Sequence, residues 1–382
     1  LFFILVLMPL ATLFADGSKR IMEGLSISSA ILGQEVKYTV VLPSGYEHGN
    51  KKYPVVYLLH GLGDNESSWL EYGRIAQVAD QAVAEKEIAP MIFVMPQGYR
   101  NYYVNDYAGI FRYEDMFVEE LVPFIDNQYR TIADSKHRAV MGYSMGGFGA
   151  LILPALHPDV FSVSVPLSIS VRTDEQYMTE DASEWNEQWG RLFGGVGKIG
   201  QDRLTDHYKE YSPFHFFRQG DPKRFIDLRL FIDNGDDEHT LCRSNEELHI
   251  LLRDLGIRHE YRVRDGGHEF SYWRSALPNA LHFISDSFEG EPYRGDVVQQ
   301  GKKKKYPKPD MMYKGNYVVV FPPGYDVASR RFPTVYLFGD MEDSRKQAIA
   351  GLAHQGMIEG TLPPLILVFL SENEKNLVDQ II

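Results

Sequence analysis

Short apolar runs recur along most of the chain and alternate with segments of helical spacing. Several of these runs are apolar at every position, which is typical of strands buried on both faces of a mainly parallel sheet. The runs cover residues 36–42, 54–59, 91–95, 138–141, 163–167, 228–232 and 260–263. The alternation predicts an α/β fold, in which helices cover both faces of the sheet.

The helices between these runs are predicted from apolar stripes and from their end signals. One stripe lies within residues 114–129. Another helix is expected to begin at a capping box formed by Ser244 and Glu247 and to end at Gly256. We expect these stripes to be packing surfaces rather than sites.

One segment, residues 172–206, interrupts the alternation with a long excursion between two strands. It carries Trp185 and Trp189 and a pair of glycines. Long insertions in compact domains are often lids or binding loops, and a plain surface excursion is the alternative.

Composition restricts the classes of partner. The apolar fraction of 44% fits a protein with a real core, and the net charge of −13 repels phosphate backbones and anionic lipids, so nucleic acid is not expected to bind. The basic run 302–305 fits a solvated linker. Cys242 is the only cysteine, which excludes an internal disulfide. Because no His-Cys cluster accompanies it, neither a structural metal nor a cofactor is expected.

The first fifteen residues are apolar but too few to span a bilayer as a helix. They are typical of a signal-peptide core, with Ala15 as a candidate cleavage position, and a buried N-terminal strand is the alternative. The sequence therefore predicts a secreted or periplasmic protein with no stable membrane insertion after signal removal.

The end of the chain repeats part of its beginning. Residues 319–325 repeat the pattern of 40–46, and 332–338 repeat 53–59 at the same offset. A constant offset indicates an internal duplication. The repeat contains no counterpart of the serine motif described below.

These patterns predict four parts of the chain. They are a signal-peptide-like segment at 1–15, an α/β domain at 22–290, a linker at 291–314, and a partial repeat of its first half at 315–382, which lacks the serine motif and is expected to be non-catalytic.

Candidate chemistry centres on Ser144, in the sequence Gly-Tyr-Ser-Met-Gly-Gly of residues 142–147. A serine hydroxyl needs an exposed position and a base, and the G-x-S-x-G turn between a strand and a helix supplies the exposure. The apolar run 138–141 precedes the motif and the helix-competent run 148–153 follows it. This context favours a nucleophile over a chance match.

An oxyanion hole is predicted from two backbone N–H groups. One belongs to Met145, the residue after the serine, and the other to Leu62, in the His-Gly-Leu-Gly segment 60–63 that follows a predicted strand. We expect His60 to be a structural hydrogen-bonding residue.

The base and the acid should follow the serine in chain order. His268 comes after two glycines and the last predicted strand, and its ordinary pKa suits proton transfer. The acid is expected in the turn after the strand 228–232, where three carboxylates compete. Spacing favours Glu238, and Asp237 is the alternative.

Several ordered blocks of the sequence resemble the esterase D and feruloyl esterase branch of the α/β-hydrolases, a group like carbohydrate esterase family 1. The resemblance covers about residues 22–290, and its blocks are 57–61, 113–115, 120–123, 142–147, and 261–268 with Tyr272 and Trp273. It implies an α/β-hydrolase fold, the triad Ser144, acid and His268, and an oxyanion hole at Leu62 and Met145. The branch usually has Asp where this chain has Glu238, and an apolar residue where it has His239.

The resemblance implies a secreted serine ester hydrolase that removes acetyl or feruloyl groups from plant polysaccharide such as xylan. The aromatic-rich loop 99–107 is a candidate stacking surface for a sugar or a phenolic acyl group, or else a packing element. Two alternatives are an S-formylglutathione hydrolase, which the export signal disfavours, and a non-catalytic carbohydrate-binding or scaffold module.

Overall fold

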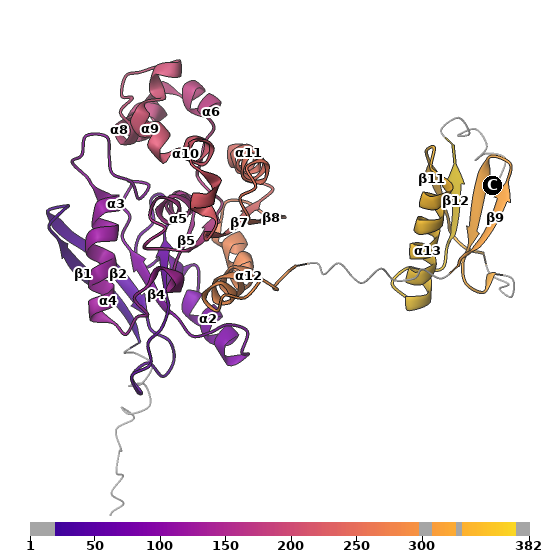
Figure 1. Cartoon of the computed structure of the whole chain (residues 1–382), viewed down its shortest axis with the longest axis horizontal. Coiled ribbons are helices and arrows are strands. Elements are labelled where there is room, and N and C mark those ends of the chain that lie inside the picture. The colour runs from indigo at the N-terminus through magenta and orange to yellow at the C-terminus, as the bar shows by residue number, and fades with distance from the viewer. Residues whose placement is uncertain (1–19, 298–307, 326–330, 372–382) are drawn as a thin grey trace, which may run out of the picture. The chain divides into compact units, whose positions relative to one another are not determined.

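The computed structural model describes residues 20–297, 308–325 and 331–371 (Figure 1). The chain divides into two compact units, Leu1–Val297 and Val298–Ile382. The segment 1–15 and the basic run 302–305 lie outside the described residues. No helix of the described part is long and apolar enough to cross a membrane.

An eight-stranded sheet forms the centre of the first unit, in the order β1-β2-β4-β3-β5-β6-β7-β8. The strands are β1 (Ile21–Ser29), β2 (Gln34–Val41), β3 (Val55–Leu59), β4 (Ile92–Pro96), β5 (Arg138–Tyr143), β6 (Val163–Leu167), β7 (Arg229–Gly235) and β8 (Glu260–Arg264). The six strands from β4 to β8 in this order are mutually parallel, whereas β1 and β2 run antiparallel to their neighbours. The predicted α/β fold with a mainly parallel sheet is confirmed.

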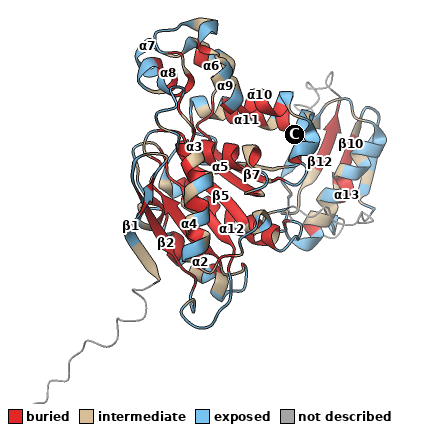
Figure 2. Ribbon diagram, turned by 60° about the vertical axis from the view of Figure 1, so that its left-hand side comes forward, coloured by how far each residue is buried: buried red, intermediate tan, exposed pale blue. Residues whose placement is uncertain are grey.

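Helices cover both faces of this sheet (Figure 2). The helical segments are α1 (Ser68–Glu71), α2 (Ile75–Ala84), α3 (Tyr113–Asp115), η1 (Met116–Leu121), α4 (Val122–Gln128), η2 (Ser135–His137), α5 (Met145–Leu156), α6 (Asp174–Thr179), α7 (Ala182–Glu184), η3 (Trp185–Trp189), α8 (Gly190–Phe193), η4 (Gly200–Arg203), α9 (Asp206–Tyr211), α10 (Pro213–Gln219), η5 (Pro222–Phe225), α11 (Thr240–Asp254) and α12 (Phe270–Phe288). Alternate residues of the strands enter two different cores: α4, α5 and α11 close one, and α1, α2 and α12 close the other. Because both faces are covered, every residue of β3, β4, β5 and β6 is buried.

All seven apolar runs form strands, but β1 was not predicted. It is an edge strand that pairs only with β2, and its register shifts between Met22 and Leu25. Gly24 stands at that irregularity with φ 67°. An edge strand that is partly exposed and carries a bulge lacks a continuous apolar run, so its sequence resembles a loop.

The predicted capping box at Ser244 is wrong. Helix α11 already begins at Thr240, and Ser244 lies inside it, fully buried. Its hydroxyl donates to the carbonyl oxygen of Val171 at 2.7 Å. Since that acceptor lies 73 residues away in the chain, no local pattern could have distinguished this serine from a cap.

The excursion between β6 and β7 folds into several short helices with an aromatic core of their own. Trp185 and Trp189 are fully buried, and Tyr177 contacts both of them edge-on. The guanidinium of Arg172 lies over the Trp189 ring, 4.6 Å from its centroid, and that of Arg203 lies over Trp185 at 4.7 Å. The tryptophans of this segment are therefore packing residues, and the segment is an ordered insertion.

The second unit contains a four-stranded sheet in the order β11-β12-β10-β9, with one long helix, α13. Its elements are β9 (Asp310–Lys314), β10 (Tyr317–Phe321), β11 (Thr334–Phe338), α13 (Asp343–Glu359) and β12 (Ile366–Leu370). β9 and β10 are antiparallel, β10 and β12 are antiparallel, and β12 and β11 are parallel. The strands β1, β2, β4 and β3 of the first unit have the same order and the same directions.

Strand β9 lies inside the segment 291–314 that the sequence predicts as a linker. Its five residues carry a charge at either end and form a hairpin with β10 through Gly315, which has φ 56°. A short strand with mostly exposed residues gives no apolar run, so its sequence is that of a linker. The strands of the second unit therefore begin before residue 315.

The centre of β3 yields a test of the core. The Tyr57 side chain is completely buried between Phe117 and Phe161, and its hydroxyl has no hydrogen-bond partner among the described residues. An unpaired buried hydroxyl destabilises a fold by about 1–3 kcal/mol. We therefore expect Tyr57→Phe to leave the free energy of unfolding unchanged or to raise it by about 1 kcal/mol, measured by chemical denaturation.

A matched control is Tyr103→Phe, because the Tyr103 hydroxyl donates to the carbonyl oxygen of His60 at 3.0 Å. This variant should lower the free energy of unfolding by about 1 kcal/mol. A loss of the same size in Tyr57→Phe would contradict the prediction.

Candidate active site

Ser144 occupies a sharp turn between β5 and α5. Its backbone has φ 57° and ψ −119°, a conformation that non-glycine residues rarely adopt. The Ser144 N–H donates to the carbonyl oxygen of Leu167 at 3.0 Å, and its own carbonyl oxygen accepts the N–H of Ser170 at 3.0 Å. Both partners belong to the end of β6 and the residues after it, so the neighbouring strand holds the strained residue in place.

Three glycines around the serine allow helix α5 to approach the sheet closely. A Cβ atom added at Gly142, Gly146 or Gly147 would collide with a backbone carbonyl oxygen, that of Gly146, Leu59 or Leu167 respectively. Two of these oxygens belong to the flanking strands β3 and β6. The motif therefore contains glycine at these positions because no side chain fits between the first turn of α5 and the sheet.

The structure brings Ser144, His268 and Glu238 into one hydrogen-bonded line. The Ser144 hydroxyl lies 2.8 Å from His268 Nε2, and His268 Nδ1 lies 3.1 Å from Glu238 Oε2. The three residues are separated widely in the chain and follow the carboxyl ends of β5, β7 and β8. About a third of the His268 side chain is exposed, so the line is open to solvent at the histidine.

The structure separates the two candidate acids. The Glu238 side chain is completely buried, and its Oε1 accepts the N–H of Gly235 at 2.9 Å and the hydroxyl of Ser168. Asp237 is exposed, and its backbone N–H donates to the carbonyl oxygen of Gly266. Of the two candidate acids, only Glu238 therefore contacts His268.

Two backbone N–H groups are expected to bind an oxyanion. One belongs to the residue after Ser144, and the other to Leu62, the residue after Gly61, where an added Cβ would lie 3.4 Å from Ser144 Cβ. Leu62 follows β3, and Met145 is the first residue of α5, where the partial positive charge of the helix terminus is concentrated. Within the described residues, neither N–H has a hydrogen-bond acceptor in the protein. Both are thus available to a negatively charged oxygen.

His60 stabilises the loop that carries Leu62 through hydrogen bonds. Its Nδ1 donates to the carbonyl oxygen of Gly61 at 2.8 Å, since that oxygen can only accept. Its Nε2 lies 2.8 Å from the N–H of Gly98 and 2.8 Å from Oε1 of Gln97. Burial lowers the pKa of His60, which keeps the ring neutral. His60 fixes the backbone before Leu62, and it contacts neither Ser144 nor His268 by a hydrogen bond.

Two residues that the spacing did not identify complete the surroundings of the triad. Ser168 contacts the acid, and Trp273 lies edge-on to His268 with the ring centroids 5.1 Å apart. Trp273 also stacks on Tyr143, at 4.1 Å between ring centroids. The sequence gives no signal for Ser168, because its partners Glu238 and Trp273 are 70 and 105 residues away in the chain.

The aromatic-rich loop 99–107 mostly packs. Tyr102 and Tyr103 are buried, whereas Tyr99 is half-buried and Tyr107 is 58% exposed. Tyr107 lies edge-on to His207 of the helical insertion. One ring of the loop is therefore free to contact a bound molecule.

Three carboxylates among the described residues form a group that could in principle hold a metal ion. The carboxylates of Asp236, Asp237 and Asp265 lie within 4.8 Å of one another. All three are exposed, and Asp236 already accepts the N–H of Gly266 at 3.1 Å. Solvated loop charges account for this group, so we assign it no metal.

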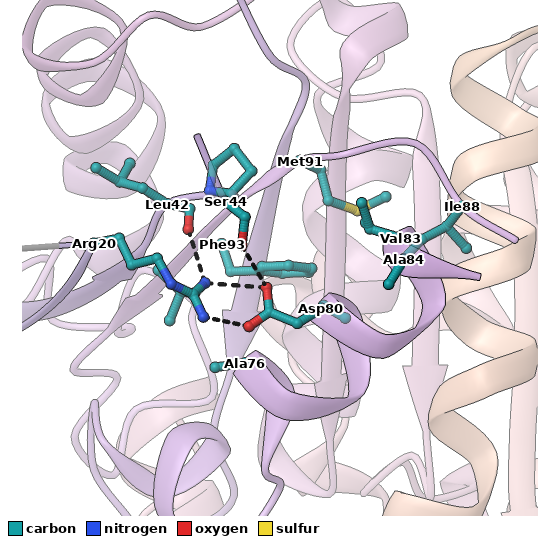
Figure 3. Close-up of a pocket in the computed structure, with 13 residues that line it drawn as sticks. Arg20, Leu42, Ser44, Ala76, Asp80, Val83, Ala84, Ile88, Met91 and Phe93 are labelled. Carbon is teal, nitrogen blue, oxygen red and sulfur yellow. Dashed lines mark hydrogen bonds and ion pairs between the residues drawn. The ribbon is translucent and has the colours of Figure 1, made fainter. Parts of the chain in front are cut away.

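A largely apolar pocket lies at the other end of the sheet (Figure 3). It is lined by the residues that follow β2, by α2 and by the start of β4, and the ion pair of Arg20 with Asp80 closes one side. Ser144 follows the carboxyl end of β5, whereas this pocket lies at the amino end of the parallel strand β4. The pocket is therefore remote from the triad.

Comparisons with known proteins identify a family that this chain resembles. The family model described as "Putative esterase" matches residues 29–284. The endo-1,4-beta-xylanase/feruloyl esterase of Xylanibacter ruminicola is 30% identical over 248 residues, which cover 62% of this chain and only 28% of that protein. A solved ferulic acid esterase is 32% identical with a TM-score of 0.58, and the match covers 69% of this chain and 96% of that one.

The S-formylglutathione hydrolase of Staphylococcus aureus has the same fold. Its TM-score is 0.56 at 21% identity, and the match covers 69% of this chain and 98% of that structure. The α/β-hydrolase fold predicted from the resemblance is thereby confirmed.

The glycines of the serine turn generate a prediction about stability. Gly146→Ala places a methyl group against the carbonyl oxygen of Leu59, which belongs to rigid backbone. We expect the free energy of unfolding to fall by about 1–3 kcal/mol in chemical denaturation.

Gly267→Ala is the matched control, because the nearest atom to its added Cβ, the carbonyl oxygen of Asp237, is 3.8 Å away. Its unfolding should be close to that of the unaltered protein. Equal stability of both variants would contradict the argument that close packing requires glycine at position 146.

Proposed function

The chain belongs to this esterase family and is an ester hydrolase, and we propose that it cleaves carboxylic esters through an acyl-enzyme on Ser144. The observation that carries the proposal is the line of hydrogen bonds from Ser144 through His268 to the buried Glu238. A serine hydroxyl at its ordinary pKa is a weak nucleophile, and a neutral imidazole at 2.8 Å is placed to take its proton.

In the first half of the reaction, Ser144 Oγ forms a bond to the carbonyl carbon of the ester while its proton moves to His268 Nε2. The carbonyl oxygen becomes an oxyanion, and the N–H groups of Leu62 and Met145 stabilise it. The carbon–oxygen bond to the alcohol then breaks, and the alcohol oxygen takes the proton from His268 Nε2. Glu238 stabilises the imidazolium through its contact with His268 Nδ1.

In the second half, water replaces the alcohol. His268 Nε2 takes a proton from the water, whose oxygen attacks the acyl carbon, and the same two N–H groups stabilise the new oxyanion. When the acyl–oxygen bond to Ser144 breaks, Ser144 recovers the proton from His268. The products are a carboxylic acid and the free enzyme, and the scheme needs no cofactor.

For the substrate, we propose acetyl or feruloyl esters on plant polysaccharide such as xylan. Two relatives support this, one named as a xylanase/feruloyl esterase and one as a ferulic acid esterase. The exposed ring of Tyr107 supports it too, because an aromatic side chain suits a phenolic acyl group or a sugar face.

We propose a secreted or periplasmic location from the apolar segment 1–15. An exported enzyme encounters polysaccharide, whereas glutathione thioesters are mainly intracellular. The location therefore favours the polysaccharide ester over S-formylglutathione as the substrate.

The function is tested by Ser144→Ala with a panel of substrates. Turnover of p-nitrophenyl acetate should fall by about a thousandfold or more, because the acyl-enzyme cannot form. The unaltered protein should release ferulate from methyl ferulate or acetate from acetylated xylan faster than it hydrolyses S-formylglutathione. If Ser144→Ala keeps its turnover, the proposed nucleophile is wrong, and if S-formylglutathione is the best substrate, the proposed substrate class is wrong.

The choice of acid is tested by two variants that each remove one negative charge from the same turn. Glu238→Gln should lower kcat on the order of 10³–10⁴-fold, since an amide cannot stabilise the imidazolium. Asp237→Asn should keep kcat within about twofold, because this side chain is solvated and does not contact His268. The reverse outcome would assign the acid to Asp237.

A further inference from the structure

Ser168 lies at the carboxyl end of β6, between the strands that lead to Ser144 and to Glu238. It is completely buried, and its backbone has φ 48°, in the left-handed region. Its N–H donates to the carbonyl oxygen of Asp233 on β7 at 2.8 Å. A buried, strained polar residue persists only where its surroundings hold it, and such residues cluster at functional sites.

The hydrogen bonds of the Ser168 hydroxyl have a fixed direction. Trp273 Nε1 lies 2.7 Å from Ser168 Oγ, and an indole N–H can only donate. The hydroxyl oxygen therefore accepts from Trp273, and its own proton is left for Oε1 of Glu238, with which it makes a short contact. Trp273 in this way orients a donor toward the acid.

The contacts of Glu238 divide between its two oxygens. Oε1 accepts two hydrogen bonds, from Ser168 and from the N–H of Gly235 at 2.9 Å. Oε2 lies 3.1 Å from His268 Nδ1. Glutamate has one more rotatable bond than aspartate, so its carboxylate needs an extra constraint to point one oxygen at the histidine.

We propose that Ser168 is a positioning residue of this triad: its hydroxyl, oriented by the Trp273 indole, fixes the Glu238 carboxylate so that Oε2 faces His268. The proposal rests on the proposed acyl-enzyme function. It assigns Ser168 no contact with the substrate, so its hydroxyl should affect the chemical step and not substrate binding.

The first test removes the hydroxyl in two ways. Ser168→Ala and Ser168→Gly both lack the donor, but glycine accepts φ 48° without strain whereas alanine does not. We expect kcat for p-nitrophenyl acetate to fall about 10–100-fold in both variants, with KM within about twofold. If Ser168 only shaped the turn, Ser168→Gly would keep its kcat, and that result would overturn the proposal.

Ser164→Ala is the matched control. Ser164 is also a completely buried serine of β6, and its hydroxyl donates to the carbonyl oxygen of Ala150 at 2.7 Å, away from the triad. This variant should keep kcat within about twofold. Thermal unfolding of all variants shows whether a lost activity reflects lost folding.

A double-mutant cycle separates positioning from a general structural effect. In the Glu238→Ala background the Ser168 hydroxyl has no carboxylate to hold, so adding Ser168→Gly should change kcat by less than about twofold. In the protein with Glu238 unaltered, Ser168→Gly should lower kcat by the full 10–100-fold. Equal losses in both backgrounds, or a loss expressed in KM, would overturn the proposal. Failure of the proposed function is seen separately, as turnover that survives Ser144→Ala.

Discussion

The contact between the first turn of α5 and the ends of β3 and β6 is the constraint on which the active site depends. Glycine at positions 142, 146 and 147 lets backbone meet backbone there. The same contact forces Ser144 to φ 57° and ties its N–H and carbonyl oxygen to the chain after β6. A serine in an ordinary conformation at this point would continue the strand or the helix, and its hydroxyl would not lie beside the histidine.

The residues after β6 connect the backbone of Ser144 to the acid Glu238. Leu167 and Ser170 hold the backbone of Ser144, and Ser168 lies between them in the chain. The N–H of Ser168 donates to β7, and its hydroxyl contacts Glu238. Two serines with positive φ therefore end adjacent strands, and one of them carries the nucleophilic oxygen while the other contacts the acid. The geometry at the nucleophile and the geometry at the acid are parts of one backbone arrangement at the carboxyl edge of the sheet.

The sequence predicts those features that depend on local pattern. Fully apolar runs identified the central strands because both faces of the sheet are covered, and the serine motif identified the turn because close packing there excludes side chains. The edge strand β1 was missed because it is partly exposed and bulged, and Ser244 was misassigned because its acceptor is the distant Val171. The acid turn shows the same limit. Spacing favours Glu238 but does not exclude Asp237, because the burial of one carboxylate depends on donors from Ser168 and from His268.

The second unit repeats the strand arrangement of one part of the first unit. Its described residues contain counterparts of β1 to β4, with the same order and directions. In the first unit every residue of β3 is buried because β5 pairs with it and helices cover both of its faces, whereas the residues of its counterpart β11 are exposed or half-buried. The nucleophile, the acid and the base all follow strands beyond β3 in the sheet, namely β5, β7 and β8. The groups that make up the hydrogen-bonded triad therefore all lie in the first unit.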